Sequence, residues 1–311
     1  MKGLRTLIAG SLCALAAPAF AGDIYVGTSI GEVFRHTSIG SSQVFPSMCT
    51  AIDSMASDGR TLYVADTFGS VFIVRTTEGN SITSIFLPAA ANAMAIHNGM
   101  LIVGSADGWI RRVDPQTGAV VGSWQVNSSV EALAVVGDTV YAGGHNTFIY
   151  KGHAVTGGFQ MFSACFGQVN SMAVNGNELL AGGLDGVVYR FNRTTSGFIG
   201  QFPVVNSDNA AIAMDGGSLW VVDSAGFIRR VNPTTGAVLF STAMCTNITA
   251  MSALPECIAD YNGDAFLNIT DFVAFQNSFA AREPRADIDA SGSLNVNDFI
   301  TFMNRFAGGC P

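Results

Sequence analysis

The sequence predicts a mainly β protein in which six similar units close into a ring, followed by a small α-helical module. Three observations support this fold class. Glycine is abundant, with 35 of the 311 residues, while only 12% of the residues are charged. A tripeptide with an apolar residue between two small ones recurs six times at a nearly constant spacing. Two loops rich in Asp and Asn are repeated near the C-terminal end.

The composition excludes several classes of protein. Hydrophobic residues make up 49% of the chain and aromatic residues 10%, which supports a packed core and is unlike a disordered chain. The chain has 15 Lys and Arg against 23 Asp and Glu, and its formal charge is -8. We therefore expect no nucleic-acid partner, because such proteins place cations against phosphates.

The first segment has the pattern of a secretory signal peptide, which we expect to span residues 1–21. Lys2 and Arg5 precede an apolar stretch over residues 7–16, and Ala19 and Ala21 are the small residues before the expected cleavage point. The apolar stretch is shorter than the ~20 residues that cross a bilayer, so we expect no transmembrane segment after signal removal. The mature protein is thus expected to be secreted or attached to the cell surface, where disulfides can form.

Six repeats follow the signal segment. The middle residues of the recurring tripeptides are spaced 39, 39, 39, 40 and 39 apart: Met55, Met94, Leu133, Met172, Ile212 and Met251. A second series is spaced 38, 39, 39, 39 and 40 apart: Tyr25, Tyr63, Ile102, Tyr141, Leu180 and Trp220. Two series with one period indicate six copies of a single structural unit.

Each unit is expected to contain four strands. One copy shows the pattern in apolar runs at residues 100–104, 109–113, 120–126 and 130–136. Turn sequences separate the runs, with Gly108 and Gly118 supplying the positive φ that tight turns require. Four strands in about 39 residues is the size of a β-propeller blade. We therefore predict a six-bladed β-propeller over residues 22–254.

The two ends of the repeat series predict how the ring closes. The mature N-terminal end begins with the strand of Tyr25 and lacks an inner strand, while the last repeat supplies an inner strand alone, around Met251. Together they complete one blade, which leaves no long unpaired edge. The repeat resembles those of quinoprotein-like and WD40-like propellers, a resemblance that implies architecture rather than function.

Two twelve-residue segments, 260–271 and 287–298, have the spacing of calcium-binding loops. Oxygen ligands recur at positions 1, 3, 5, 9 and 12, and the carbonyl at position 7 is a further candidate. The candidate ligands are Asp260, Asn262, Asp264, Phe266, Asn268 and Asp271 in the first loop, and Asp287, Asp289, Ser291, Ser293, Asn295 and Asp298 in the second. Because Ca²⁺ takes six to eight oxygens, we expect two calcium ions.

Each loop is followed by a segment with Phe at its first, fourth and eighth places, over residues 272–279 and 299–306. These positions share one face of a helix, so the two helices are expected to pack on each other. The duplicated unit over residues 257–311 resembles a GC-type dockerin, an EF-hand-like module. That resemblance implies attachment to a cohesin-like partner or a surface scaffold. Asp271 and Asp298 stand where a longer Glu is usual, which is a departure from sensor EF-hands.

Five cysteines remain after signal removal. Cys257 and Cys310 flank the calcium module, and a disulfide between them would join its two ends. Cys49, Cys165 and Cys245 occupy equivalent places before inner strands. Either Cys49 pairs with Cys245 across neighbouring blades, or all three are small buried hydrophobic residues.

The propeller carries few candidate catalytic groups. Its four histidines fall at different phases of the repeat and are not expected to converge, and no Gly-x-Ser-x-Gly motif is present. A basic residue recurs on the third strand of five blades, at Arg35, Arg112, Lys151, Arg190 and Arg230. These cations either form a ring that binds anionic sugars or carboxylates, or each spans its own blade and pairs with turn Asp or carbonyl groups.

Two functional hypotheses follow. The first is an exported, non-catalytic propeller that binds a protein or glycan ligand and is attached through its calcium module. The alternative is a secreted polysaccharide-active enzyme, a lyase or hydrolase, anchored by the same module. The lack of converging His, Glu and Tyr before the inner strands favours the first. A quinone-dependent dehydrogenase is disfavoured, because the repeats contain neither adjacent cysteines nor an acidic calcium site.

Overall fold

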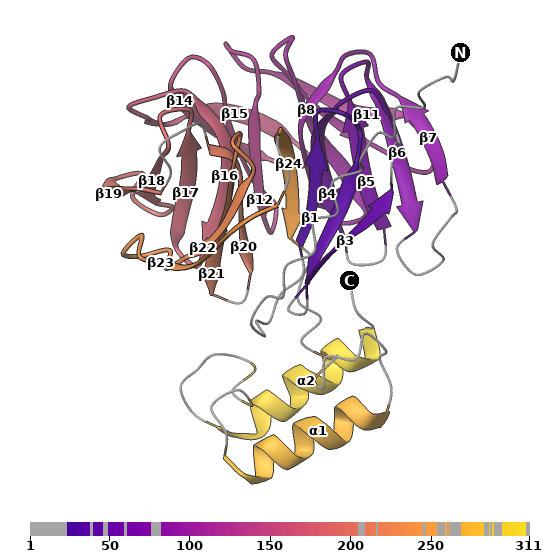
Figure 1. Ribbon diagram of the computed structural model, residues 1–311, viewed down its shortest axis with the longest axis vertical. Coiled ribbons are helices and arrows are strands. Elements are labelled where there is room, and N and C mark those ends of the chain that lie inside the picture. The colour runs from indigo at the N-terminus through magenta and orange to yellow at the C-terminus, as the bar shows by residue number, and fades with distance from the viewer. Residues whose placement is uncertain are drawn as a thin grey trace, which may run out of the picture.

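The computed structural model describes residues 24–37, 40–45, 49–58, 61–75, 82–204, 209–215, 217–244, 247–253, 269–282 and 294–308, with residues 259, 261, 286 and 288. Within these residues the chain forms 24 strands and two helices (Figure 1). The predicted mainly β class is confirmed. The expected signal peptide lies outside the described residues.

The strands form six antiparallel four-stranded sheets, the blades of a propeller (Figure 1). Blades two to four, from the inner strand outward, are β4 (Ile52–Ser57), β5 (Thr61–Asp66), β6 (Ser70–Arg75) and β7 (Ile82–Phe86); β8 (Ala91–His97), β9 (Met100–Ser105), β10 (Trp109–Val113) and β11 (Val120–Gln125); β12 (Ala132–Val136), β13 (Thr139–Gly143), β14 (Phe148–His153) and β15 (Gly157–Ala164). Blades five and six are β16 (Val169–Asn175), β17 (Glu178–Gly183), β18 (Val187–Asn192) and β19 (Phe198–Pro203); β20 (Asn209–Asp215), β21 (Ser218–Asp223), β22 (Phe227–Val231) and β23 (Val238–Ala243).

Blade one joins the two ends of the repeat series. Its strand order is β24 (Ile248–Ala253), β1 (Ile24–Thr28), β2 (Val33–Thr37) and β3 (Gly40–Phe45). The strand β1 pairs with β24 antiparallel, with Ile24 opposite Ala253 and Gly27 opposite Ala250. The predicted closure is therefore confirmed: hydrogen bonds between segments more than 200 residues apart complete the ring.

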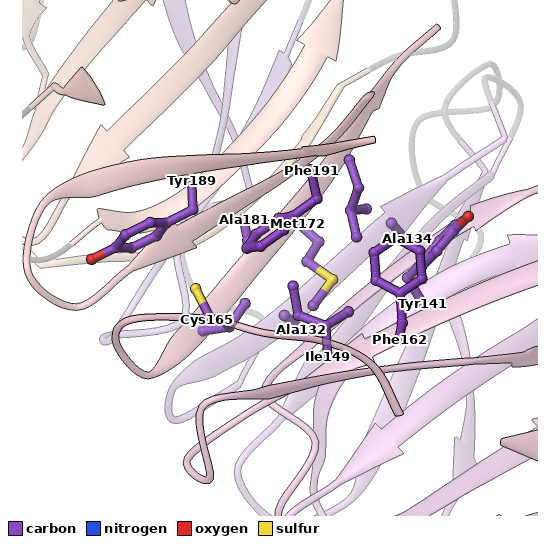
Figure 2. Packing of buried hydrophobic residues seen from close by; sticks show 12 residues of the cluster. Ala132, Ala134, Tyr141, Ile149, Phe162, Cys165, Met172, Ala181, Tyr189 and Phe191 are labelled. Carbon is purple, nitrogen blue, oxygen red and sulfur yellow. The ribbon is translucent and has the colours of Figure 1, made fainter. Parts of the chain in front are cut away.

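The repeat period has its physical origin in the packing between blades. Met172, the centre of the fourth tripeptide, is buried with Ala132 of blade four and with Tyr189 and Phe191 of its own blade (Figure 2). The small residues beside each tripeptide centre allow neighbouring inner strands to approach. One apolar side chain per blade then fills the space between two sheets, which requires the same spacing in every repeat.

Turn chemistry fixes the ends of the strands. The Oδ1 of Asp66 accepts hydrogen bonds from the backbone N–H of Phe68 and of Ser70, both at 2.9 Å. At the equivalent turn of blade one, Gly31 has φ +77°, and a Cβ there would lie 1.9 Å from the carbonyl oxygen of Cys49. Only glycine fits that position.

Two helices, α1 (Ile269–Ala280) and α2 (Val296–Gly308), follow the ring. Their inward faces carry the repeated phenylalanines, and the rings of Phe275 and Phe302 stack with centroids 4.1 Å apart. Tyr261 packs edge-on against both of these rings. The predicted helix pair is confirmed, and related positions 27 residues apart meet at its centre. No helix among the described residues is long and apolar enough to span a membrane.

Each inner strand runs from one face of the ring to the other. We call the side where the inner strands begin the front face and the side where they end the rear face. Ala253, the last residue of β24, lies at the rear face opposite Ile24. The inner strand β24 therefore ends at the rear face.

Candidate functional site

A cavity of about 440 Å³ follows the central channel of the propeller. Its lining comes from all six inner strands, β4, β8, β12, β16, β20 and β24, and from Glu131 just before β12. Alanine dominates the middle of the wall because five of the six tripeptides end in alanine. Small side chains beside the tripeptide centres thus leave the channel open.

A ring of polar side chains surrounds the front mouth of the channel. Each repeat contributes the residue that lies two positions before its tripeptide centre. This residue is polar in five repeats and alanine, at position 210, in the remaining one. The members of this polar ring are Asp53, Asn92, Glu131, Asn170 and Thr249. All five are half-buried, as expected for side chains at the mouth of a narrow channel.

The rear mouth has the opposite character. The side chains at this mouth come from the residue two positions beyond each tripeptide centre, which is four residues after the polar-ring residue of the same repeat. These side chains are mostly apolar. This apolar ring consists of Ile96, Val135, Val174, Met214 and Ala253, and Ser57 takes the sixth place. The channel therefore changes from charged and polar at the front to hydrocarbon at the rear.

Hydrogen bonds connect the polar ring across blade boundaries. The Nδ2 of Asn92 donates to Oε2 of Glu131 at 2.8 Å, which joins blade three to blade four. Thr249 donates through Oγ1 to the carbonyl of Ile52, which joins blade one to blade two. These contacts hold ring members in fixed positions at the mouth.

The environment of Asp53 at the front mouth disfavours the charged form of its carboxyl group. Burial, followed by the charges of the nearby carboxylates of Asp66 and Glu131, raises the pKa of Asp53 to about 6. None of the described residues lining the cavity is Lys, Arg or His. The described channel wall therefore holds two acidic side chains, Asp53 and Glu131, and no basic one.

Asp53→Asn is expected to stabilise the folded protein at neutral pH. The unfolded chain releases this proton near pH 4 and the folded chain near pH 6, so stability falls as pH rises through this window and the loss is complete above it. The variant should gain on the order of 1–2 kcal/mol at pH 7.5 and nothing at pH 3.5. Urea unfolding at both pH values measures this difference.

Asp114→Asn is the matched control for this prediction. Hydrogen bonds from the backbone N–H of Gln116 and from the hydroxyl of Thr117 lower the pKa of Asp114. Removing this carboxylate should therefore destabilise the folded protein at pH 7.5. Equal effects of Asp53→Asn at pH 3.5 and pH 7.5 would show that titration of this carboxyl is not the cause.

A serine, a histidine and a glutamate meet beside the polar ring. The Nδ1 of His145 lies 3.3 Å from Oε1 of Glu131 and within hydrogen-bond distance of Oγ of Ser129. Both contacts use the same ring nitrogen. The imidazole therefore cannot relay a proton from the serine to the carboxylate in the manner of a catalytic triad, which needs both nitrogens.

The expectation that the histidines do not converge is wrong for two of them. The Nε2 of His97 lies 2.8 Å from Asp138 Oδ1, and the Nε2 of His153 lies 4.0 Å from Oδ2 of the same carboxylate. His97 lies at the end of β8, and Asp138 follows β12 in the next blade. Their contact depends on blade packing, which the phase of a histidine within its own repeat does not reveal.

The five recurring cations lie away from the cavity lining. On the adjacent strand, each cation pairs with a residue of the repeat series that runs from Tyr25 to Trp220. Lys151, for example, is the cross-strand partner of Tyr141. Arg190 donates to both carboxylate oxygens of Glu178, at 2.9 and 2.7 Å, and to the carbonyl of Thr234 in the next blade. Lys151 likewise reaches the carbonyl of Arg193 in the next blade, at 3.5 Å.

Two propeller cysteines carry free thiols. Cys49 is half-buried and Cys165 is buried. Burial, followed by the charge of Asp66, raises the pKa of Cys49 to about 11, so its thiol stays protonated. The pairing of Cys49 with Cys245 stays a prediction, and Cys165 fits the alternative of a small buried hydrophobic residue. Cys245, Cys257 and Cys310 lie outside the described residues.

Sequence comparison identifies the family. A profile of the family described as outer membrane protein assembly factor BamB matches residues 48–242 and, in a second alignment, residues 106–285. The chain belongs to this family. A comparison with curated proteins gave no match.

Solved structures share the fold of this BamB-family chain. The WD40 β-propeller domain of Doa1 has 14% identity and a TM-score of 0.59, covering 74% of this chain and 82% of that one. The computationally designed Ika8 protein has 16% identity and a TM-score of 0.54, with coverage of 78% and 91%. A chain of the nidogen/laminin complex has 10% identity and a TM-score of 0.67, with coverage of 76% and 99%. At these identities the similarity shows the fold alone.

The C-terminal helices carry the described part of the predicted calcium loops, and α2 lies beyond the residues matched to the family. Asp271 and Asp298 occupy equivalent places in the first turns of α1 and α2, and both have 0% exposure. Asp298 Oδ2 accepts a hydrogen bond from the N–H of Asn295 at 2.8 Å, which brings loop positions 9 and 12 together. The buried carboxylates of Asp271 and Asp298, at position 12 of the two loops, fit an oxygen-ligated cation.

The other candidate ligands lie outside the described residues: Asp260, Asn262, Asp264, Phe266, Asn268, Asp287, Asp289, Ser291 and Ser293. Within the part of the chain that is described, no group of three His, Cys, Asp or Glu is placed to hold a metal. The bond from Asn295 to Asp298 is also a capping-box contact, which by itself stabilises the start of α2.

Proposed function

We propose that this BamB-family protein is an exported, non-catalytic propeller that binds a protein or glycan ligand at the front mouth of its channel. The observation that supports this most is the polar ring, which places hydrogen-bonding and charged groups around an accessible cavity. Ser129 and His145 lie beside that ring, but His145 meets both Ser129 and Glu131 through one ring nitrogen and so forms no catalytic triad with them. Binding without chemistry is the function that this arrangement supports best.

We further propose that the C-terminal module binds two calcium ions and attaches the protein to a cohesin-like or surface scaffold partner. The complete burial of Asp271 and Asp298 supports this, because a bound cation would offset the cost of burying their charges. The related packing of α1 and α2 around Phe275 and Phe302 supports a duplicated unit. Calcium, when bound, would supply the positive charge that ties each loop to the start of its helix.

We infer export from the N-terminal segment. Lys2, Arg5 and the small residues at 19 and 21 have the signal-peptide pattern. The description of the family refers to a factor of outer-membrane protein assembly, which agrees with a protein that leaves the cytoplasm. Secretion followed by attachment at the cell surface is the location that we propose.

The alternative, a secreted polysaccharide lyase or hydrolase, has one observation in its favour. Asp53 and Glu131 are two carboxylates at one mouth, and Asp53 has a raised pKa, as a general acid would. The position of His145 against Glu131 adds a further titratable group there. This alternative predicts turnover of a polymer and its loss in Glu131→Gln.

Screening the purified protein against a glycan array and a panel of polysaccharides tests the proposal. The expected result is saturable binding with no release of product, and weaker binding by Glu131→Gln at the ring. The control Asp114→Asn removes the same charge from an exposed rear-face turn and should bind normally. Product release that disappears in Glu131→Gln would establish the enzyme instead.

A further inference from the structure

We propose that the front-mouth site takes an aliphatic cation: an ammonium or guanidinium group at the polar ring, with a hydrocarbon chain running along the channel toward the apolar ring. This inference rests on the proposed function, because it names the ligand chemistry of the same site. It goes beyond that function by specifying the charge, the shape and the orientation of the ligand.

The charge of the wall supports a cation. Asp53 and Glu131 line the cavity, and no basic residue does so among the described lining residues. Two arginines, Arg111 on β10 and Arg229 on β22, are engaged in ion pairs within their own blades. Arg111 contacts Asp107 at 2.5 Å, and Arg229 is paired with Asp223. His145, whose Nδ1 lies 3.3 Å from Glu131, is the described basic side chain that contacts these carboxylates, and a ligand can supply a permanent cation.

The wall also holds a buried acceptor that the protein itself does not use. Ser171 is 7% exposed and lines the cavity next to Asn170. Its Oγ has no hydrogen-bond partner, whereas the Oγ of Ser54, at the equivalent place in blade two, donates to the carbonyl of Ala91. A buried hydroxyl without a partner is costly, and because a hydroxyl both donates and accepts, Ser171 favours a polar group at this end of the channel without selecting its charge. The sign of that charge is set by Asp53 and Glu131.

The shape of the channel supports a linear hydrocarbon chain behind the cation. Four strand residues separate the polar ring from the apolar ring, which corresponds to about 13 Å along a strand. The wall between the two rings consists of alanine, serine and the apolar tripeptide centres, and it offers no charge. An eight-carbon chain is roughly 10 Å long when extended, so its end would come within about 3 Å of the level of the apolar ring around Val135 and Val174.

Calorimetric titration with octylammonium, butylammonium and octanoate tests the inference. We expect one octylammonium to bind per chain, with affinity falling about fourfold for each methylene removed. Octanoate, which has the same chain and the opposite charge, should not bind. Glu131→Gln and Asp53→Asn should each weaken octylammonium binding at least tenfold, while Asp114→Asn leaves it unchanged. Circular dichroism confirms that each variant is folded.

Three results would overturn the inference: octanoate binding as well as octylammonium, equal affinities for the butyl and octyl cations, or an equal loss in Asp114→Asn. A capped lysine or arginine that displaces octylammonium would identify a basic side chain of a partner protein as the natural source. Failure of both to displace it would identify a free aliphatic cation. Binding of a glycan or protein ligand without any octylammonium binding overturns this inference alone, and the proposed function then stands.

Discussion

A chain that stops at residue 247 is expected to lose the cooperative unfolding transition of the propeller, while a chain that stops at residue 254 keeps it. The shorter chain lacks β24 and therefore leaves β1 as an unpaired inner edge. It also removes Ile248, Ala250 and Met251 from the packing between blades. Lost burial of the two large side chains alone amounts to about 3–6 kcal/mol, a substantial part of the 5–15 kcal/mol of a typical folded domain.

Thermal unfolding followed by circular dichroism and tryptophan fluorescence measures this difference. Trp220 is 1% exposed and belongs to the same packed cluster as Ile248 and Met251, so its emission should shift to the red in the shorter chain. The chain ending at residue 254 is the matched control, because it lacks the C-terminal module and keeps the closed ring. Identical melting curves for both chains would mean that β24 does not hold the ring closed.

The second large effect is expected on removal of calcium. In the proposed module, ligand binding stabilises the folded form by about 2.7 kcal/mol per site when free calcium is 100 times the dissociation constant. A chelator should therefore lower the melting temperature of the helical module and leave that of the propeller unchanged. The double variant Asp271→Ala with Asp298→Ala should show no response to calcium.

Those substitutions also remove buried side chains and a helix-start contact, so the informative quantity is the difference between melts with and without calcium. Gln276→Ala, at an exposed position of α1, is the matched control and should respond to calcium as the natural chain does. A calcium response in the double variant equal to that of the control would show that the two buried carboxylates are not ligands.

Much of the propeller could be predicted from the sequence because a repeated fold requires a repeated packing residue. The expected strand at residues 109–113 coincides with β10, and the inner strand around Met251 closes the ring as expected. The bounds of β11 and β12 differ from the expected runs by one or two residues. Turn residues such as Gly108, whose φ is +80°, mark where strands end.

The polar ring follows the same period and was not identified from the sequence. Asp53, Asn92 and Glu131 are 39 residues apart, so aligning the repeats would have revealed the column. What the alignment does not show is which column faces the channel, since that depends on how the sheets are arranged around the axis. The sequence indicated the recurring cations as a candidate binding ring. In the structure they do not line the cavity, and Arg190 and Lys151 contact carbonyls in the next blade.

Contacts between blades were hardest to predict. His97 meets Asp138 across 41 residues, and Asn92 meets Glu131 across 39. Such pairs lie close only because equivalent positions of neighbouring blades are adjacent in space. The pattern within one repeat therefore carries information on strands and turns, while the electrostatics of the channel depend on the assembled ring.

Equilibrium dialysis against calcium, followed by elemental analysis of the protein, tests most directly whether this propeller carries a calcium-held attachment module. Two ions per chain are expected, one after Asp271→Ala or Asp298→Ala alone, and none after both. A natural chain that retains no calcium at millimolar concentration would contradict the proposed module and the mode of attachment that depends on it.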